Sequence, residues 1–364
     1  MKAKLHRDFD RVLFIVTLVI FAIGLSSIYS ATHTEGSGLL GGLVLKQILW
    51  MCAGLVILFL ILNIDYQRFI DWAYILFGLN CLLLVMVLFF GRARFGAQRW
   101  FSIGGFGFQP SEFIKITYIL ALSSYLGTRA KFSYRITDLF VPFLITMPPL
   151  VLIYLQPDLG TALVLMPILF FMLFARGARI RHLLTIISIG LLSTPFIWHM
   201  LKEYQKLRLS VFINPNADPL GAGYTMIQSR IAIGSGFVLG KGWLSGTQNQ
   251  LNFLPERHTD FIFSVIGEEG GFIGCLILIG LFSVLLYRGL KIAGATADTY
   301  GRSMAVGIIA MLAFQIIVNL GMAAGFMPVV GLPLPLMSYG GSSLITTMIS
   351  IGLLLNIGMR RPRF

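Results

Sequence analysis

The stretch VLFIVTLVIFAIGLSSIYS, residues 12–30, decides the fold class, because no charged side chain interrupts it from end to end. An α-helix of roughly that many residues spans the hydrocarbon core of a lipid bilayer, which is about 30 Å thick. The whole chain is 57% hydrophobic and 12% charged, with a mean hydropathy of +0.84, whereas a soluble domain carries about twice that share of charge. Because lipid offers no hydrogen-bonding partners, such a window is expected to form a helix.

Similar windows recur along the chain and predict an all-α, polytopic membrane protein of about ten transmembrane helices, forming a single domain over residues 1–364. The expected spans are approximately 12–30, 44–63, 70–90, 113–126, 139–155, 161–175, 183–200, 261–287, 303–326 and 344–359. Lys and Arg cluster before residue 12 and at 129–135, 176–181, 288–302 and 360–363. The positive-inside rule places these clusters, and both termini, in the cytoplasm.

Three long segments fall on the opposite side of the predicted bundle, at about 91–109, 201–259 and 327–343. Long connections usually carry function when they are not linkers. The third is too rich in proline and glycine for a regular helix, so we expect it to line a cavity or to be buried in protein. The remaining cations lie in or near these segments: Lys46, Arg92, Arg94, Arg99, Lys115, Lys202, Lys206, Arg208, Arg230, Lys241 and Arg257. They either contact lipid headgroups and solvent or bind an anionic, phosphorylated substrate.

Several motifs together resemble the SEDS family of cell-wall proteins (shape, elongation, division, sporulation). They include GAQRWF (96–101), QPSEFIK (109–115), QPDLGTA (156–162), PERHTDFIF (255–263) and GLPLPLMSYGGSS (331–343). The likeness covers nearly the whole chain, in order, and PERHTDFIF is more similar to the elongation branch than to the division branch.

The resemblance implies a multi-pass glycosyltransferase of the bacterial cytoplasmic (inner) membrane. Such an enzyme polymerises lipid II, an undecaprenyl-pyrophosphate-linked disaccharide peptide, into glycan strands for cell-wall elongation and rod shape, at a site on the extracytoplasmic face. The implied protein partner is a class B penicillin-binding protein, which crosslinks the strands. We expect no nucleic-acid partner.

Asp260 is the expected catalytic residue. In this reaction the hydroxyl of one sugar attacks the anomeric carbon of another, so the nucleophile needs a base and the departing pyrophosphate needs positive charge. One carboxylate can suffice, because pyrophosphate leaves without a proton from a general acid. Asp260 stands at the predicted outer mouth of a span, and the resemblance also implies this role. The alternative is that Thr259 or Asp260 caps the following helix.

The other candidate site residues are polar groups near the same boundary. Glu112 and Lys115, at i and i+3, either form a structural salt bridge or shape the substrate cavity. Asp158 either caps a helix that starts at Leu159 or faces the cavity. The candidates for holding pyrophosphate and sugar are Arg99, Trp100, Lys241 and Arg257.

Glu268 and Glu269 lie too far along the helix to share a bond-forming step with Asp260. Intramembrane carboxylates are often functional, yet these two are flanked by glycines and could equally bond a helix that approaches closely. The histidines and cysteines show no metal-ligand spacing, so no protein-encoded metal site is expected. A divalent cation bridging pyrophosphate and a carboxylate is chemically reasonable.

Three other functions compete with elongation. A division polymerase would share the same chemistry. A lipid II flippase or other transporter would also use a polytopic bundle with buried charges and broken helices, but would need polar groups across the whole bilayer. A scaffold would only recruit the crosslinking enzyme.

Overall fold

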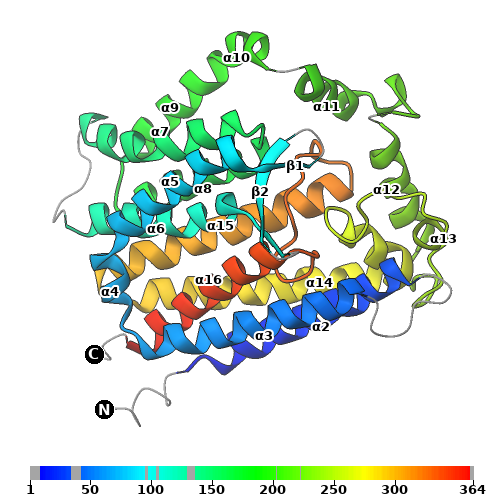
Figure 1. Cartoon of the computed structure of the whole chain (residues 1–364), viewed down its shortest axis with the longest axis horizontal. Helices are drawn as coiled ribbons and strands as arrows, with labels where there is room; N and C mark the ends of the chain where they lie inside the picture. Colours follow the sequence, from blue (N-terminus) through cyan, green and yellow to red (C-terminus); the bar gives the residue numbers. More distant parts are fainter. Residues whose placement is uncertain are drawn as a thin grey trace.

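The computed structural model describes residues 9–33, 42–94, 97–103, 106–128, 136–201, 203–221 and 223–360, which form a helical bundle (Figure 1). The elements are α2 (Arg11–Thr32), α3 (Gly42–Asn63), α4 (Tyr66–Asp71), α5 (Ala73–Phe90), β1 (Arg92–Arg94), β2 (Ala97–Ile103), β3 (Phe106–Phe108), α6 (Pro110–Gly127), η2 (Ile136–Leu139), α7 (Phe140–Leu155), α8 (Leu159–Ala175), α9 (Ile180–Leu192), α10 (Thr194–Met200), α11 (Glu203–Ile213), η3 (Pro215–Ala217), α12 (Tyr224–Ser235), α13 (Thr247–Gln250), α14 (Ile262–Ala295), α15 (Thr299–Ala323) and α16 (Gly341–Arg360).

Each predicted span falls on helix, and the polytopic all-α fold is confirmed. Seven of the described helices are long and apolar enough to cross a membrane by length and composition. The other predicted spans fall on α8 and α9, which are shorter, and on α6, which carries Glu112 and Lys115. The span expected at 183–200 is two helices, because the first ends at Leu192 and Pro195, which has no N–H to donate, follows the break.

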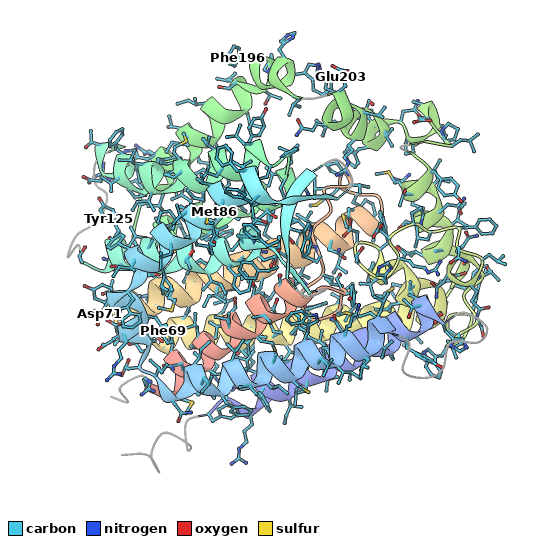
Figure 2. All side chains as sticks on the ribbon, in the orientation of Figure 1. Phe69, Asp71, Met86, Tyr125, Phe196 and Glu203 are labelled. Atoms are coloured by element: carbon cyan, nitrogen blue, oxygen red, sulfur yellow. The ribbon has the colours of Figure 1, made fainter. Side chains whose placement is uncertain are left out.

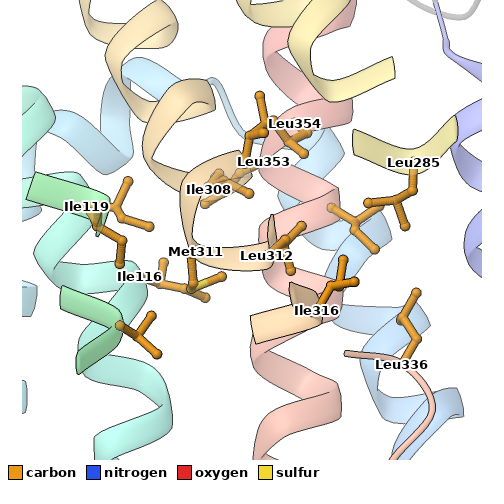
Figure 3. Packing of buried hydrophobic residues seen from close by; sticks show 14 of the residues in the cluster. Ile116, Ile119, Leu285, Ile308, Met311, Leu312, Ile316, Leu336, Leu353 and Leu354 are labelled. Atoms are coloured by element: carbon orange, nitrogen blue, oxygen red, sulfur yellow. The ribbon is translucent and has the colours of Figure 1, made fainter. Parts of the chain in front are cut away.

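Helix α15 occupies the centre of the bundle. Its buried side chains lie among those of α6, α14 and α16 (Figure 3): Ile308, Met311, Leu312 and Ile316 against Ile116, Ile119, Leu285, Leu353 and Leu354. The close approach requires a small residue, since a Cβ on Gly307 would come within 2.7 Å of Met172 Sδ and 2.9 Å of Ile119 Cγ2. Because lipid tails are as apolar as these side chains, packing of this kind holds such a bundle together.

The first residues of α2 and the last residues of α16 lie at the same end of the bundle (Figure 1). Ion pairs at that end join Arg288 to Asp10 at 2.6 Å and Arg360 to Asp65 at 3.8 Å. Helices α12 and α13 lie at the opposite end (Figure 1). Several cations used in the charge argument lie outside the described residues: Lys2, Lys4, Arg7, Arg129, Lys131, Arg135, Lys202, Arg361 and Arg363.

The segment at 91–109 contains strands that the sequence reading did not anticipate. β1, β2 and β3 form a small antiparallel meander, in which Trp100 pairs with Arg92 and Phe101 pairs with Phe108. Aromatic and β-branched residues of this kind favour strands over loop. The first residue of α6 follows this sheet directly, so the meander fixes how the chain enters that helix.

The segment at 201–259 is also not a simple loop, because it forms α11, α12 and α13. Ser229 of α12 anchors that helix in the bundle: its hydroxyl lies 2.6 Å from the Ser264 hydroxyl of α14 and donates to the Ala323 carbonyl at 2.6 Å. Helices α10 and α11 project from the bundle, as Phe196 and Glu203 show (Figure 2), and the Phe196 ring is 70% exposed.

Helix α14 is broken inside the membrane region at Gly271, whose φ of 62° suits glycine. The break removes the helical bonds of Phe272 and Ile273, and their N–H groups donate instead to the carbonyls of Phe237 and Val238, at 2.9 and 3.1 Å. The freed carbonyls of Glu268 and Glu269 accept from the N–H groups of residues 241 and 242, each at 3.0 Å. The loop after α12 therefore satisfies the backbone groups that the break exposes, as a bilayer requires.

Candidate active site

Asp260 lies in the turn that leads into α14. Its N–H donates to the Glu256 carbonyl at 3.1 Å, and its carbonyl accepts from Asn319 Nδ2 at 3.0 Å. The carboxylate does not cap the helix: the cap position is Phe261, and no side chain makes a cap hydrogen bond there. The helix-capping alternative for Asp260 is therefore not what the structure contains.

The Asp260 carboxylate is half-buried, and it accepts no hydrogen bond from the part of the chain that the structure describes. Burial raises its pKa from the ordinary 3.8 to about 6, and the negative charge of Glu256 adds to the rise. Arg208 opposes this shift. A carboxylate with a pKa near the working pH can both exist as the base and hold a proton once it has accepted one.

Arg99 and Asp158 are brought together beside this carboxylate. Arg99 Nε donates to the Gln156 carbonyl at 2.9 Å, its Nη2 donates to the Pro157 carbonyl, and its Nη1 lies 3.6 Å from Asp158 Oδ1. Both charges influence the pKa of Asp260, Asp158 raising it and Arg99 lowering it. The Arg99 side chain remains 28% exposed, and its guanidinium is held in place by these bonds.

Asp158 caps α8, and its position toward a substrate cavity stays a prediction. Its Oδ1 accepts from the Thr161 N–H at 3.2 Å and its Oδ2 from the Thr161 hydroxyl at 3.0 Å, which caps α8. The same Oδ1 forms the ion pair with Arg99. The helix start expected at Leu159 is confirmed.

Arg208 belongs to this group, although the sequence reading counted it only among the outer cations. It lies on α11, its Nη1 donates to the Val329 carbonyl at 3.2 Å, and its charge lowers the pKa of Asp260. Glu256, four residues before Asp260, was missed as well. The position of Arg208 in an outer segment between predicted spans was the only sequence feature that could have indicated a role at the site. Many residues separate it from Asp260 in the chain, and only the fold brings the two together.

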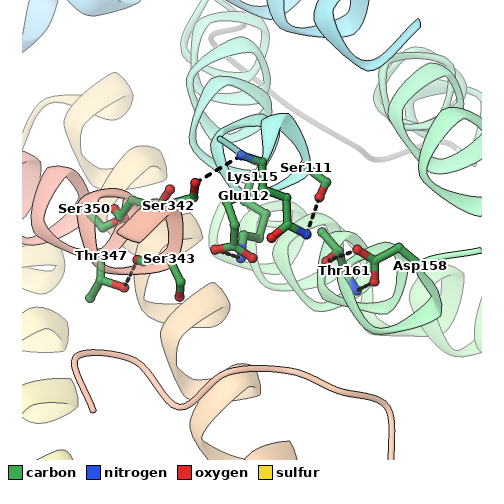
Figure 4. A network of polar contacts seen from close by, with 11 residues as sticks. Ser111, Glu112, Lys115, Asp158, Thr161, Ser342, Ser343, Thr347 and Ser350 are labelled. Carbon is green, nitrogen blue, oxygen red and sulfur yellow. Dashed lines mark hydrogen bonds and ion pairs between the residues drawn. The ribbon is translucent and has the colours of Figure 1, made fainter. Parts of the chain in front are cut away.

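Glu112 and Lys115 form a buried ion pair on α6, with Lys115 Nζ 2.8 Å from Glu112 Oε2. Their side chains are only 4% and 0% exposed. Figure 4 shows the pair between the first turn of α16, at Ser342, and the Asp158–Thr161 cap of α8. The pair thus lies inside the bundle, near Asp158, which pairs with Arg99. Its role in catalysis stays a prediction.

Trp100 of β2 is half-buried, and its ring lies over Gly107 of β3, where an added Cβ would come within 3.0 Å of Cε3. This contact occupies one side of the ring. Stacking of a sugar would use what remains accessible.

Lys241 and Arg257 are held by contacts away from the Asp260 carboxylate. Lys241 Nζ lies 2.8 Å from Glu268 Oε1 and donates to the Thr247 hydroxyl at 2.8 Å. Arg257 Nε donates to the Ala31 carbonyl of α2 at 2.6 Å, and burial lowers the pKa of its guanidinium. Their predicted contact with substrate would have to be made in addition to these bonds.

Glu268 and Glu269 bind neighbouring segments of the chain. Glu268 accepts from the N–H groups of Gln248 at 3.0 Å and Asn249 at 3.3 Å, besides its ion pair with Lys241. Glu269 accepts from the Ser30 hydroxyl of α2. The two carboxylates therefore attach the loop after α12, and α2, to the first half of α14.

Within the described residues, no group of three or more His, Cys, Asp or Glu side chains could hold a metal ion. The charges that act on Asp260 include two arginines, Arg99 and Arg208, besides the carboxylates of Glu256 and Asp158, and guanidinium groups suit a phosphorylated anion.

The chain matches the family model FtsW/RodA/SpoVE, described as cell cycle protein, over residues 10–362. It is 40% identical to the peptidoglycan glycosyltransferase MrdB of Escherichia coli K12 over 359 residues, which cover 98% of this chain and 95% of that one.

Two solved structures share the fold. A peptidoglycan synthase complex, described as coordinating polymerization and crosslinking, contains a chain with a TM-score of 0.83 and 36% identity, covering 96% of this chain and 97% of that one. The rod shape determining protein RodA of Thermus thermophilus gives a TM-score of 0.74 at 35% identity, with 98% of each chain covered. On the extent of these matches, the chain belongs to the FtsW/RodA/SpoVE family, the SEDS proteins that its motifs resemble.

Proposed function

We propose that this protein is a peptidoglycan glycosyltransferase of the elongation type, which polymerises lipid II into glycan strands with Asp260 as the general base. The relatives named MrdB and RodA support the activity and the role in cell shape. The observation that carries the residue assignment is the Asp260 carboxylate: half-buried, free of hydrogen bonds from the described chain, and with a pKa raised to about 6.

The reaction follows from the charges around that carboxylate. The 4-hydroxyl of the acceptor sugar attacks the anomeric carbon of the donor, and its proton passes to Asp260. The new C–O bond forms as the bond to the pyrophosphate breaks, so the anomeric configuration inverts and the electron pair leaves with pyrophosphate. Arg99 and Arg208, whose charges act on Asp260, stabilise the growing negative charge on the leaving group.

The proposed site faces the outside of the membrane. Helix α14, which follows Asp260, begins at the end of the bundle opposite the start of α2 and the end of α16 (Figure 1), and the positive-inside rule supports placing that end outside the bacterial cytoplasmic membrane. Lipid II and the growing glycan strand would meet there. A class B penicillin-binding protein is the proposed partner, which fits the likeness to a chain of a peptidoglycan synthase complex.

The test is polymerisation of fluorescent lipid II by the purified full chain, with and without the partner. Asp260→Asn keeps the size of the side chain but cannot accept the proton, so we expect glycan product to fall by at least about a hundredfold while lipid II still binds. Glu203→Gln, a change at an exposed carboxylate, serves as the matched control and should leave the rate unchanged.

The pH profile gives a second readout. Asp260 must be ionised to act, so the wild-type rate should fall as the pH falls through about 6. A flippase or a scaffold would give no glycan product, with or without the crosslinking enzyme, because neither forms the glycosidic bond. An Asp260→Asn protein that makes long strands at the wild-type rate would remove Asp260 from the mechanism.

A further inference from the structure

Three consecutive carbonyls, those of residues 258, 259 and 260, are each held by a group from another part of the chain. The Tyr339 N–H donates to the His258 carbonyl at 2.9 Å, and the Ser338 hydroxyl donates to the Thr259 carbonyl at 2.5 Å. Asn319 Nδ2 donates to the Asp260 carbonyl at 3.0 Å. The backbone that carries the carboxylate is thus fixed by α15 and by the segment before α16.

Asn319 makes a second bond with the same nitrogen. Nδ2 also donates to the Leu332 carbonyl at 2.7 Å, and the side chain is fully buried in α15. One amide group therefore joins the Asp260 backbone to the segment 329–332. Because a single nitrogen serves both carbonyls, any displacement of one carbonyl changes the bond to the other.

The 329–332 segment contacts the remaining parts of the site in sequence. The Val329 carbonyl accepts from Arg208 Nη1 at 3.2 Å. The Val330 carbonyl lies against the first turn of α8, where a Cβ on Gly160 would come within 2.6 Å of it.

The next residue lies beside the carboxylate. Gly331, with φ of +71°, lies so that an added Cβ would stand 3.3 Å from Asp260 Oδ2. Leu332 then supplies the carbonyl that Asn319 binds. The segment therefore couples the arginine on α11, the helix that Asp158 caps and the Asp260 carboxylate, and Asn319 ties it down.

We propose that Asn319 is a positioning residue for Asp260: its amide fixes the Asp260 backbone and the 329–332 segment relative to each other, and so sets where the carboxylate meets the acceptor sugar. The proposal rests on the proposed function, in which Asp260 is the base. Asn319 itself is fully buried and does not touch substrate. It acts on the rate of the chemical step through geometry, since a misplacement of about 1 Å can reduce a rate by roughly a hundredfold.

The test compares Asn319→Leu with Gln315→Leu in the full chain, with lipid II and the partner present. Leu has nearly the shape of Asn but donates no hydrogen bond. Gln315 is a buried amide one turn earlier on the same helix, and it makes no hydrogen bond to the described residues. We expect Asn319→Leu to lower kcat roughly tenfold to a hundredfold, with KM for lipid II near the wild-type value, and Gln315→Leu to lower neither.

The pH profile separates positioning from a general loss of stability. Displacing Gly331 from beside the carboxylate admits water, which lowers the carboxyl pKa. The acid limb of the rate profile, where the rate falls with falling pH, should therefore lie at lower pH in Asn319→Leu than in the wild type, whose limb lies near pH 6. The charged groups that act on the carboxylate, Glu256, Arg208, Asp158 and Arg99, are unchanged by the substitution. A destabilised but correctly arranged site would lose active protein without moving the limb.

An unchanged kcat and acid limb in folded Asn319→Leu would overturn the proposal. If that variant does not fold, Asn319→Ser, which is smaller and cannot bridge both carbonyls, replaces it, and unchanged kinetics in this variant contradict the proposal equally. Asp260→Asn in the same assay distinguishes failure of the positioning role from failure of the proposed function. If Asp260→Asn is inactive while the Asn319 variants behave as wild type, only the positioning role fails; if Asp260→Asn is active, the proposed function fails.

Discussion

Replacing Asp260 by asparagine should make the protein more stable at neutral pH, because the native fold strains the ionised carboxylate. The carboxyl pKa is 3.8 in the unfolded chain and about 6 in the fold. Each pH interval of one between these values corresponds to about 1.4 kcal/mol. The ionised carboxylate therefore lowers the stability of the folded state by at most about 3 kcal/mol, and Asp260→Asn removes this penalty.

The pH dependence follows from the direction of the shift. Below the unfolded pKa of 3.8 both states are protonated, and the carboxyl has no effect on stability. As the pH rises toward about 6 the unfolded state loses its proton first, so the wild-type protein loses stability over that interval. Above it the difference between the two proteins should be constant.

The assay is thermal unfolding of both proteins in the same detergent across that pH range. We expect the midpoint of Asp260→Asn to exceed that of the wild type by roughly a few degrees above pH 7, and the two to converge near about pH 4. Glu203→Gln, at an exposed carboxylate, should show no such divergence. A capping role gives another result, since Asn caps about as well as Asp: equal midpoints at every pH would refute the reasoning.

Two further predictions concern topology and the buried ion pair. With the native cysteines replaced, Ser245→Cys should react with an impermeant thiol reagent in intact spheroplasts. Asp71→Cys, on the exposed surface of α4, should react only after permeabilisation. The reverse pattern would place the site in the cytoplasm. Glu112→Gln and Lys115→Met should each destabilise the protein by about 3–5 kcal/mol, since each leaves a buried charge unpaired. The double variant should lose less stability than the sum of the two single losses. Additive losses in a double-mutant cycle would mean that the two side chains act independently.

The spans could be read from the sequence because hydrophobicity and length determine a transmembrane helix almost by themselves. The breaks within these spans are not visible in hydrophobicity and length. Gly271 interrupts α14 without a proline, shortly after Glu268 and Glu269, and the break is possible only because the loop at 237–242 pairs with the exposed backbone. Such compensation depends on residues distant in the chain, which a local pattern cannot reveal.

The candidate site was predictable where neighbours in sequence are neighbours in space. Glu112 and Lys115 meet because they are one helical turn apart, and Asp158 caps the helix that begins next to it. The contact of Arg208 with Val329, by contrast, joins α11 to the segment before α16, and no spacing predicts it. Lys241 pairs with Glu268, whose buried carboxylate needs a cation, and its contact with substrate stays a prediction.

Comparison of the buried carboxylates explains why Asp260 stands apart. Among the described residues, Glu112, Asp158, Glu268 and Glu269 are buried, and each accepts a bond from a cation, a hydroxyl or a backbone N–H. The Asp260 side chain, unlike these four, accepts no hydrogen bond from the described residues, although its backbone is held on both sides. A fold that satisfies its other interior carboxylates and leaves one unsatisfied retains a penalty that selection would otherwise remove. The penalty is what keeps the pKa high enough for Asp260 to accept a proton from a sugar hydroxyl, so the same feature that weakens the fold supports the chemistry.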